Sequence, residues 1–372
     1  MVTHVRDVST AARPDLAELE CASLEDLLAS RGHPRFHGPQ IFQWIYRRGV
    51  ATPAGMTDLP HRLRDEIATE FVLSTPRLVQ RERSIDGTEK FLLSLPHGQV
   101  VESVFIPDTP AMTFCISTQV GCAMACAFCL TGKMGLTRNL TAGEIVGQVR
   151  VLADTLAMRD ARFNIVFMGM GEPLHNYDET MKALRILTDA RGLAIAPRRI
   201  TLSTVGLPPA LERLANETVM PNLAISLHAP TDRQRGALVP INKKYGIADI
   251  IDACRRFPVK RRSRITFEYV LLAGVNDAPK DAHALAKLLS GLKSKVNLIP
   301  LNAAAGIAFE RPSDRAIDQF ARILAEHRVV VSVRKSRGRD IRAACGQLIV
   351  ESARPSPAQQ LATAAFGGEV PG

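Results

Sequence analysis

The stretch Gly121-Cys-Ala-Met-Ala-Cys-Ala-Phe-Cys129 places Cys122, Cys126 and Cys129 at the spacing C-x3-C-x2-C. A 4Fe–4S cube takes one thiolate per iron, so three cysteines on one short loop leave the fourth iron open for chemistry. Two other interpretations exist, namely three buried apolar thiols or a zinc site. Zinc sites usually combine two C-x2-C-like pairs, and this sequence has no second pair. The spacing therefore favours an iron–sulfur cluster as a cofactor.

The composition is that of a globular protein with an excess of positive charge. The 372 residues are 46% hydrophobic and include 47 Lys plus Arg against 37 Asp plus Glu, a net charge of +10. Such an excess favours polyanionic partners, of which RNA is the first to consider. The chain has no run of about eighteen apolar residues and no apolar leader, so we expect a cytoplasmic protein without a membrane segment. Its seven cysteines would stay reduced in that compartment.

The N-terminal quarter of the chain has a helical pattern with basic edges. We expect a flexible segment at 1–20 and a helical RNA-binding accessory domain at 21–75, with Ser23 as the N-cap of its first helix. One apolar face of the next helix carries Ile41, Trp44 and Ile45. The basic edges consist of Arg47, Arg48, Arg62 and Arg64. These arginines contact RNA in one interpretation and form only a solvated face in the other.

Residues 76–110 have the pattern of a short antiparallel sheet that links two domains. Three segments of β character, 78–83, 90–95 and 99–106, follow one another, with an Asp-Gly turn between the first two. Glu102 is the one carboxylate in an otherwise apolar strand. By itself, such a carboxylate usually faces solvent.

From residue 111 to 350 short β-branched segments alternate with longer helical ones. The predicted strands are 112–118, 164–168, 199–204, 222–226, 264–270, 296–300 and 329–334. The clearest helix runs from Thr141 to about Met158 and opens with the capping-box pattern Thr141-Ala-Gly-Glu144. The pattern predicts an α/β fold with parallel strands, either a partial (βα)6 TIM-like barrel or an open doubly wound sheet. Residues 351–372 have the composition of a disordered tail.

Polar residues follow several of the predicted strands, where the functional loops of such folds lie. A glycine-bearing turn, Met168-Gly-Met-Gly-Glu-Pro173, includes Gly171 and Glu172 and lacks the lysine of a P-loop. Further candidates are Ser203, Ser226, His228 and Asn302. Each of these could instead be part of a tight turn, a helix cap or a satisfied buried group.

Cys345 lies in a basic setting near the end of the chain. Five basic residues between positions 334 and 342 precede it. Positive surroundings favour the thiolate, so Cys345 is a candidate nucleophile, with structural burial as the alternative. Cys115 is equally consistent with simple core burial. We interpret Cys21 and Cys254 as structural.

The cluster loop resembles that of radical S-adenosylmethionine (SAM) enzymes, in which the open iron chelates SAM and the fold is a partial (βα)6 barrel. With Gly-Met-Gly-Glu-Pro, Ser-Leu-His-Ala-Pro, Val-Pro-Ile-Asn-Lys-Lys and Ala-Cys-Gly-Gln-Leu, residues 23–350 resemble the bacterial dual-specificity adenine-C2 methyltransferases of 23S ribosomal RNA and transfer RNA. The resemblance implies that Cys122, Cys126 and Cys129 ligate the cluster. It also implies a SAM site made of Gly171, Glu172, Ser203, Ser226, Leu227, His228 and Asn302.

The same resemblance implies a radical mechanism that uses two SAM molecules per turnover. Cys345 would carry the methyl group, Glu102 would accept the C2 proton, and Cys115 would release the product by forming a transient disulfide with Cys345. We expect 23S rRNA and tRNA as partners, an electron donor such as a flavodoxin system, and a monomer. Two alternatives remain: a related enzyme that methylates C8 of the ribosomal adenine and confers antibiotic resistance, and a non-enzymatic iron–sulfur RNA-binding sensor.

Overall fold

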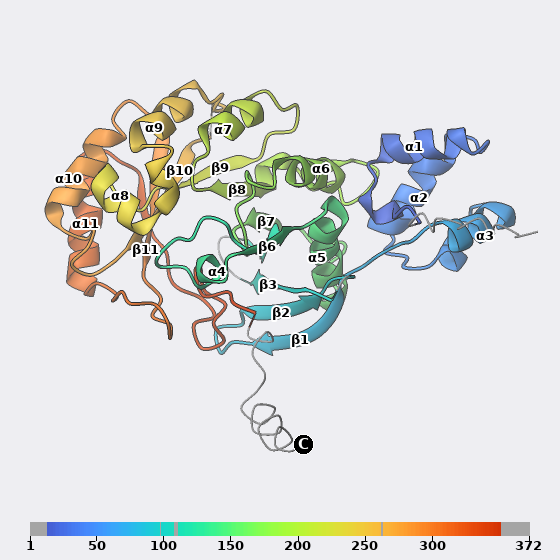
Figure 1. Cartoon of the computed structure of the whole chain (residues 1–372), viewed down its shortest axis with the longest axis horizontal. Coiled ribbons are helices and arrows are strands. Elements are labelled where there is room, and N and C mark those ends of the chain that lie inside the picture. The colour runs from blue at the N-terminus through green and yellow to red at the C-terminus, as the bar shows by residue number, and fades with distance from the viewer. Residues whose placement is uncertain (1–12, 97, 108–110, 262, 351–372) are drawn as a thin grey trace, which may run out of the picture.

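The computed structural model describes residues 13–350, apart from 97, 108–110 and 262. Most of the predicted flexible N-terminus and all of the predicted disordered tail lie outside the described residues. No described helix is both long and apolar enough to cross a membrane. Figure 1 shows the helical N-terminal region at one side of a larger α/β body.

The N-terminal region contains α1 (Cys21–Ser30), α2 (His37–Tyr46) and α3 (His61–Glu70). Ile41, Trp44 and Ile45 are buried on one face of α2, as the apolar spacing predicts. The prediction of Ser23 as an N-cap was wrong, because α1 already begins at Cys21 and Glu20 precedes it without a capping side-chain bond. This region packs on the α/β body, where the carboxylate of Glu18 accepts a hydrogen bond from the Gly143 N–H at 2.9 Å.

Three antiparallel strands follow: β1 (Arg77–Arg83), β2 (Glu89–Ser94) and β3 (Val100–Ile106). They match the three predicted segments. They are not an isolated sheet, because β3 pairs antiparallel with β4 (Thr113–Cys115) and so continues the main sheet. In Figure 1, β1, β2 and β3 form the lower edge of the body.

The main sheet continues with parallel strands that curve around a common interior. After β4 its order is β7 (Asn164–Phe167), β8 (Ile200–Thr204), β9 (Asn222–Ser226), β10 (Ile265–Leu271), β11 (Ser294–Pro300) and β12 (Val331–Val333). The described sheet stays open, since β1 and β12 are its two edges. Its parallel strands follow one another in sequence order, without the reversal of order that a doubly wound sheet has, so the predicted partial barrel is confirmed and the doubly wound alternative is wrong. The predicted strand 222–226 matches β9, whereas β4 and β12 are shorter than predicted.

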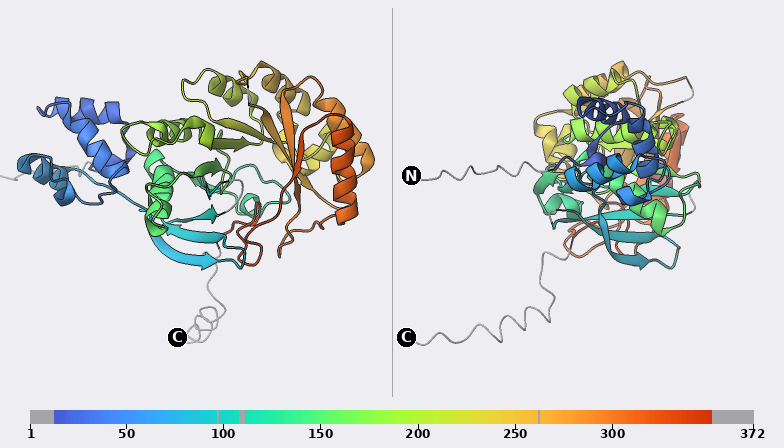
Figure 2. Two further views of the ribbon diagram at one scale, coloured as in Figure 1. Left: turned by 180° about the vertical axis from the view of Figure 1, so that it is seen from behind. Right: turned by 90° about the vertical axis from the view of Figure 1, so that its right-hand side faces the viewer.

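Helices cover the outside of this curved wall, as the view from behind in Figure 2 shows. They are α5 (Ala142–Thr155), α6 (Tyr177–Thr188), α7 (Pro208–Ala215), α8 (Asp232–Leu238), α9 (Ile247–Arg256), α10 (Pro279–Leu288) and α11 (Asp314–Glu326). The predicted capping box of α5 is present, with the Glu144 N–H donating to the Thr141 hydroxyl at 3.2 Å and the Thr141 N–H donating to the Glu144 carboxylate at 3.0 Å. Parallel strands with helices outside leave the strand C-termini and their loops free to form a site.

The cluster loop lies between two short additional elements of the fold. It starts at the end of β5 (Gln119–Gly121), which pairs with β6 (Leu136–Asn139) in a separate two-stranded sheet. It ends at the short helix α4 (Leu130–Lys133). The loop therefore follows the first parallel strand closely, which places its cysteines at the C-terminal edge of the main sheet.

Candidate active site

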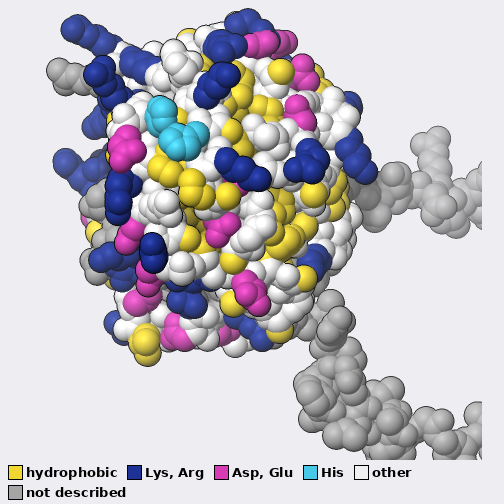
Figure 3. Space-filling view, turned by 90° about the vertical axis from the view of Figure 1, so that its left-hand side faces the viewer, with side chains coloured by type: hydrophobic (Ala, Val, Ile, Leu, Met, Phe, Trp, Pro, Cys, Tyr) yellow, Lys and Arg dark blue, Asp and Glu magenta, His cyan; other side chains and the backbone are white. Residues whose placement is uncertain are grey.

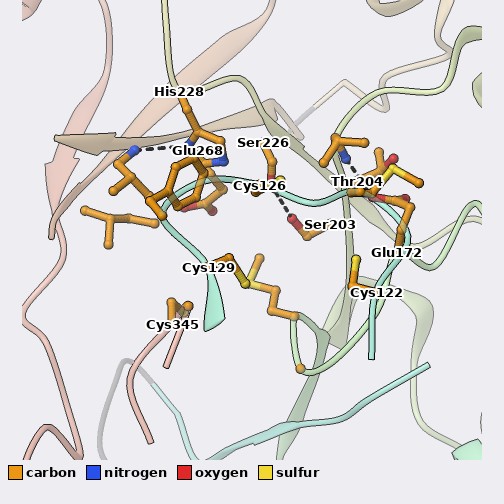
Figure 4. Close-up of a pocket in the computed structure, with 18 of the residues that line it drawn as sticks. Cys122, Cys126, Cys129, Glu172, Ser203, Thr204, Ser226, His228, Glu268 and Cys345 are labelled. Carbon is orange, nitrogen blue, oxygen red and sulfur yellow. Dashed lines mark hydrogen bonds between the residues drawn. The ribbon is translucent and has the colours of Figure 1, made fainter. Parts of the chain in front are cut away.

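A cavity of about 150 Å³ lies inside the curve of the parallel strands. Its wall comes from the cluster loop, from the C-terminal ends of β7 to β11, and from the segment after β12. Figure 4 shows the cluster cysteines, the polar strand-end residues and Cys345 around this one space. Residues that are far apart in the sequence thus line the same cavity.

The three cluster cysteines all line the cavity. Burial raises the pKa of Cys122 to about 12 and the pKa of Cys126 well above its ordinary value, and the neighbouring sulfurs add to both shifts. Three thiolates can share this space only with a cationic group among them. Gly132 of α4 permits the tight loop, since a Cβ there would lie 2.9 Å from the Cys126 nitrogen.

The chemistry of the three cysteine side chains suits an iron–sulfur cluster. A 4Fe–4S cluster binds three thiolates through three different irons, so its ligands do not have to converge on one point. The donor set of three thiolates facing a common cavity therefore fits the cluster.

Gly171 and Glu172 form the part of the cavity wall that follows β7. Gly171 has a φ of +101°, and a Cβ on it would lie 2.6 Å from the Gln119 side chain, so only glycine fits. The Glu172 carboxylate accepts hydrogen bonds from the N–H groups of Leu174, at 3.0 Å, and Val205, at 2.8 Å. Even so, burial raises the pKa of Glu172 to about 7. An ammonium group bound against this carboxylate would favour its ionised form.

Two serines at the ends of β8 and β9, and a histidine just after β9, line the cavity with Glu172. The hydroxyls of Ser203 and Ser226 are 3.3 Å apart, and both residues line the cavity. Burial lowers the pKa of His228 to about 3, so its ring is neutral, and Nδ1 accepts a hydrogen bond from the Val270 N–H at 3.1 Å. Its ring meets that of Phe128 edge-on, with 4.7 Å between the centroids. The contact joins the cluster loop to the predicted SAM site.

Asn302 and Leu227 differ in their relation to the cavity. Asn302 lines it, and its buried Oδ1 has no hydrogen-bond partner among the described residues. A buried polar atom without a partner costs about 1–3 kcal/mol, which is the expected signature of a site for a polar ligand. Leu227 is fully buried in the core and does not line the cavity, although its backbone N–H bonds to the Glu268 carbonyl at 3.1 Å. The fold thus brings all the predicted SAM residues except Leu227 to the cavity wall.

Cys345 lines the cavity from the segment after β12. This segment is fastened to the cluster loop, because the Thr131 hydroxyl donates to the Leu348 carbonyl at 2.6 Å. Arg334 lines the same wall, and the neighbouring Cys345 sulfur, together with Glu268, raises the pKa of the Arg334 guanidinium. Arg334 therefore contributes to the basic setting predicted for Cys345.

Cys115 is buried at the end of β4 and is not part of the cavity lining. Burial raises its pKa to about 12, and the nearby Cys345 sulfur contributes to that shift. The fold therefore places the two predicted partners close to one another. Cys21 lies in α1 and Cys254 in α9, both buried, in agreement with structural roles.

Glu102 is buried in β3 and does not face solvent, which corrects the simple interpretation of a lone strand carboxylate. One carboxylate oxygen accepts a hydrogen bond from the Ile349 N–H at 2.8 Å, and the other lies 3.2 Å from the Lys90 ammonium. Burial raises the pKa of Glu102, and Lys90 opposes that shift. Glu102 does not line the cavity and lies instead against the segment that carries Cys345.

Sequence reasoning missed two charged residues of the cavity wall, Glu268 and Arg334, the second of which it counted only as part of a basic run. Glu268 is a buried carboxylate on β10 that accepts a hydrogen bond from the Asn297 amide at 2.7 Å. A carboxylate inside the apolar run Ile265–Leu271 was the available signal. Its position facing the cavity depends on the curvature of the sheet, which the sequence does not show.

The arginines of the N-terminal region differ in how far they are engaged. Arg48 stacks over the Trp44 ring at 4.0 Å and lies 3.7 Å from the Asp58 carboxylate. Arg47 and Arg62 are exposed. Lys and Arg side chains also stand along the rim of the opposite side of the molecule, shown in Figure 3. The positive charge is therefore spread over the surface, and Arg47 and Arg62 are the arginines of this region most available to a partner.

Comparison with known proteins identifies the family. A model of the radical SAM superfamily matches residues 116–286, and a model of the ribosomal RNA large subunit methyltransferase N-terminal domain matches residues 14–73. The chain is 46% identical to the dual-specificity RNA methyltransferase RlmN of Anaeromyxobacter dehalogenans, over 97% of this chain and 98% of that protein. It is 50% identical to the protein of the same name from Geobacter sulfurreducens, over 90% and 91% of the two chains.

A solved structure gives the same result. The crystal structure of a radical SAM methyltransferase from Sphaerobacter thermophilus superposes with a TM-score of 0.85 and 48% identity, covering 90% of this chain and 99% of that one. A radical SAM fold implies a 4Fe–4S cluster and SAM, for which the cavity has suitable residues. The chain therefore belongs to the radical SAM superfamily and, within it, to the family of dual-specificity RNA methyltransferases.

Proposed function

We propose that this protein methylates C2 of adenine in 23S ribosomal RNA and in transfer RNA. The observation that carries the proposal is the single cavity lined by three cluster cysteines, by the polar strand-end residues and by Cys345. Adenine C2 is electrophilic and its hydrogen is not acidic, so C2 cannot attack the methyl group of SAM directly. A cysteine that carries the methyl group beside a radical-generating cofactor removes this difficulty.

The protein's own residues have distinct roles in this reaction. Gly171, Glu172 and Asn302 bind SAM, and the Cys345 sulfur accepts a methyl group from one SAM molecule. When bound, the 4Fe–4S cluster supplies the electron that cleaves a second SAM molecule. Arg334, beside the sulfur, holds Cys345 in the cavity where one hydrogen is removed from the S-methyl group.

The carbon radical on Cys345 then adds to C2 of the adenine. Glu102 takes the C2 proton, and one electron returns to the electron-transfer partner, which leaves a thioether between Cys345 and the base. The Cys115 thiol then attacks the Cys345 sulfur, the sulfur–carbon bond breaks, and the departing carbon takes up the proton of the Cys115 thiol to complete the methyl group as the disulfide forms. Glu102 is bonded to the Ile349 N–H, so the segment carrying Cys345 has to shift before Glu102 reaches the base.

We assign RNA binding to the helical domain at 21–75, connection to the sheet at 76–110, and chemistry to the barrel at 111–350. A reduced flavodoxin-type protein is the proposed electron donor. The enzyme acts as a monomer in the cytoplasm, where a reducing pool restores the Cys115 and Cys345 thiols after each turnover.

The test compares RNA from a deletion strain with RNA from the same strain after the gene is restored. Nucleosides from purified 23S rRNA and tRNA are separated and identified by mass spectrometry. We expect 2-methyladenosine to disappear with the gene and return with it. The appearance of 8-methyladenosine instead would establish the C8 alternative, and unchanged nucleosides with no methyl group on Cys345 would favour the sensor.

A further inference from the structure

Three charged residues of alternating sign lie on one face of the antiparallel strands. The Lys90 ammonium on β2 is 3.2 Å from the Glu102 carboxylate on β3 and 3.5 Å from the Glu82 carboxylate on β1. The strand register explains the alignment, because Glu82 is paired with Lys90, and Glu102 is paired with Leu92, two residues along the same face. The three side chains therefore form a continuous row across three strands.

The row runs from the interior of the protein to its surface. The exposed fraction of the side chain rises from 5% at Glu102 through 11% at Lys90 to 34% at Glu82. Glu82 also accepts a hydrogen bond from the exposed Gln80 amide at 3.1 Å. Each step along the row is short enough for direct contact or for one intervening water.

Among the described residues, the charged groups with the largest effect on Glu102 are Lys90 and Glu82. The segment that covers it from the C-terminal side contributes the neutral Ile349 N–H. On the other side, β4 pairs with β3 and places Cys115 opposite Val104, two residues from Glu102 along the same strand. Burial raises the pKa of the Cys115 thiol to about 12, so this thiol is neutral. Lys90 is thus the cation that balances Glu102.

We propose that Lys90 and Glu82 are the path by which the proton taken up by Glu102 leaves the enzyme. The inference rests on the proposed function, in which Glu102 removes the C2 proton. Lys90 and Glu82 act through Glu102 and do not touch the substrate, so both are positioning residues.

The charges and protons balance over four proton transfers. The C2–H bond breaks, and its electron pair stays on the adenine ring. The proton goes to Glu102, which becomes a neutral carboxylic acid. The Lys90 ammonium gives a proton to the Glu82 carboxylate, and the resulting amine takes the proton of Glu102. Glu82 then releases its proton to water. One proton has reached the solvent, and all three residues have regained their starting charges.

Replacement of Lys90 by arginine separates this role from a purely structural ion pair. Arginine keeps the positive charge opposite Glu102, but a guanidinium does not release a proton under these conditions. If Lys90 only stabilises the sheet through an ion pair, the Lys90→Arg enzyme keeps the wild-type rate. If Lys90 passes a proton on, the Lys90→Arg enzyme is slow.

The experiment measures rates of 2-methyladenosine formation against pH for the full-length, cluster-loaded enzyme with saturating RNA. We expect Lys90→Arg and Glu82→Gln to lower the rate roughly tenfold or more. We expect Lys90→Met, in addition, to move the acid limb of the profile upward by about one pH unit, because Glu102 loses its cation. Methylation of Cys345, which precedes proton removal, stays at the wild-type level in all three variants. Lys280→Met, an exposed change on α10, is the control.

Each possible result is informative. Wild-type rates and pH profiles in Lys90→Arg and Glu82→Gln would overturn the proton path and leave the proposed function intact. If the wild-type enzyme formed no 2-methyladenosine, both the proposed function and the inference would be wrong. Should Lys90→Met fail to fold, the other two variants still decide, since they keep the charge or the shape of the side chain.

Discussion

The backbone N–H of Leu130 donates a hydrogen bond to the carbonyl of Gly346 at 2.8 Å. Leu130 directly follows the last cluster cysteine, and Gly346 directly follows the predicted methyl-carrying cysteine. This bond joins the first residue of α4 to the segment that carries Cys345. The position of Cys345 therefore depends on an intact cluster loop and on α4.

Replacement of Cys122, Cys126 or Cys129 by alanine is expected to abolish the brown absorbance of the cluster and the cleavage of SAM. Each substitution leaves one iron without its thiolate. Iron content and visible spectra of the anaerobically purified proteins check this. Cys254→Ala, in α9, is the matched control and keeps the cluster. Wild-type iron content in all three cluster variants would contradict the assignment.

The two cysteines outside the cluster are expected to fail in different ways. Cys345→Ala gives an unmethylated, inactive protein without attached RNA, because nothing accepts the methyl group. Cys115→Ala accumulates a covalent adduct between Cys345 and RNA, because no thiol attacks the sulfur to free the carbon. Intact-protein mass spectrometry with and without nuclease detects the adduct. Normal turnover of Cys115→Ala without bound RNA would assign product release to another thiol or an external reductant.

Asn302→Leu is expected to weaken SAM binding by roughly tenfold or more without lowering the stability of the protein. The buried Oδ1 has no partner within the described part of the chain, so its removal costs the unliganded fold nothing while the ligand loses a hydrogen bond. Calorimetric binding to the cluster-loaded enzyme and urea unfolding measure the two effects. The control is Asn216→Leu, at the exposed end of α7. Equal loss of stability and of affinity would mean that Asn302 is only structural.

The stability of the cluster-free protein is expected to fall as the pH rises from about 5 to 7, because of Glu172. Its pKa is about 7 in the folded protein against 4.5 ordinarily, so the folded state keeps a proton that the unfolded chain has lost. The full effect on the free energy of unfolding is roughly 3 kcal/mol. Glu172→Gln should flatten this slope in urea unfolding across the pH range. Glu212→Gln, exposed on α7, should leave it unchanged, and equal slopes in both variants would refute the prediction.

Arg47→Gln and Arg62→Gln are each expected to weaken RNA binding and to reduce its dependence on salt, by a slope of about one per phosphate contact. These single substitutions test RNA binding more specifically than removal of residues 1–75 does. That deletion would also remove the Glu18 carboxylate bound to the first turn of α5. Binding of tRNA measured over a range of salt concentrations provides the slopes. Unchanged slopes, matching a Lys280→Gln control, would place the RNA contact elsewhere.

The cluster loop and most strands were predictable because their signals are local. The three cysteines lie within eight residues, and strand β9 and helix α5 follow from hydrophobic pattern and capping residues alone. The Ser23 cap failed because several residues near a helix start can serve as the N-cap, and packing decides which one does. The SAM residues and the pairing of Cys115 with Cys345 came from resemblance, since single polar residues after strands have no distinctive local pattern.

The tertiary structure alone decided which distant residues meet. The burial of Glu102, its contact with Lys90, and the position of Arg334 beside Cys345 all depend on how the antiparallel strands and the segment after β12 pack together. The hydrophobic periodicity of a sequence reports local secondary structure only. It does not show which residues meet when hundreds of positions separate them in the chain. The sequence by itself determined the cofactor and the strands, because spacing and alternation are properties of a short stretch of chain. Only the folded sheet set the charges around each reacting group, because burial and neighbouring side chains control them.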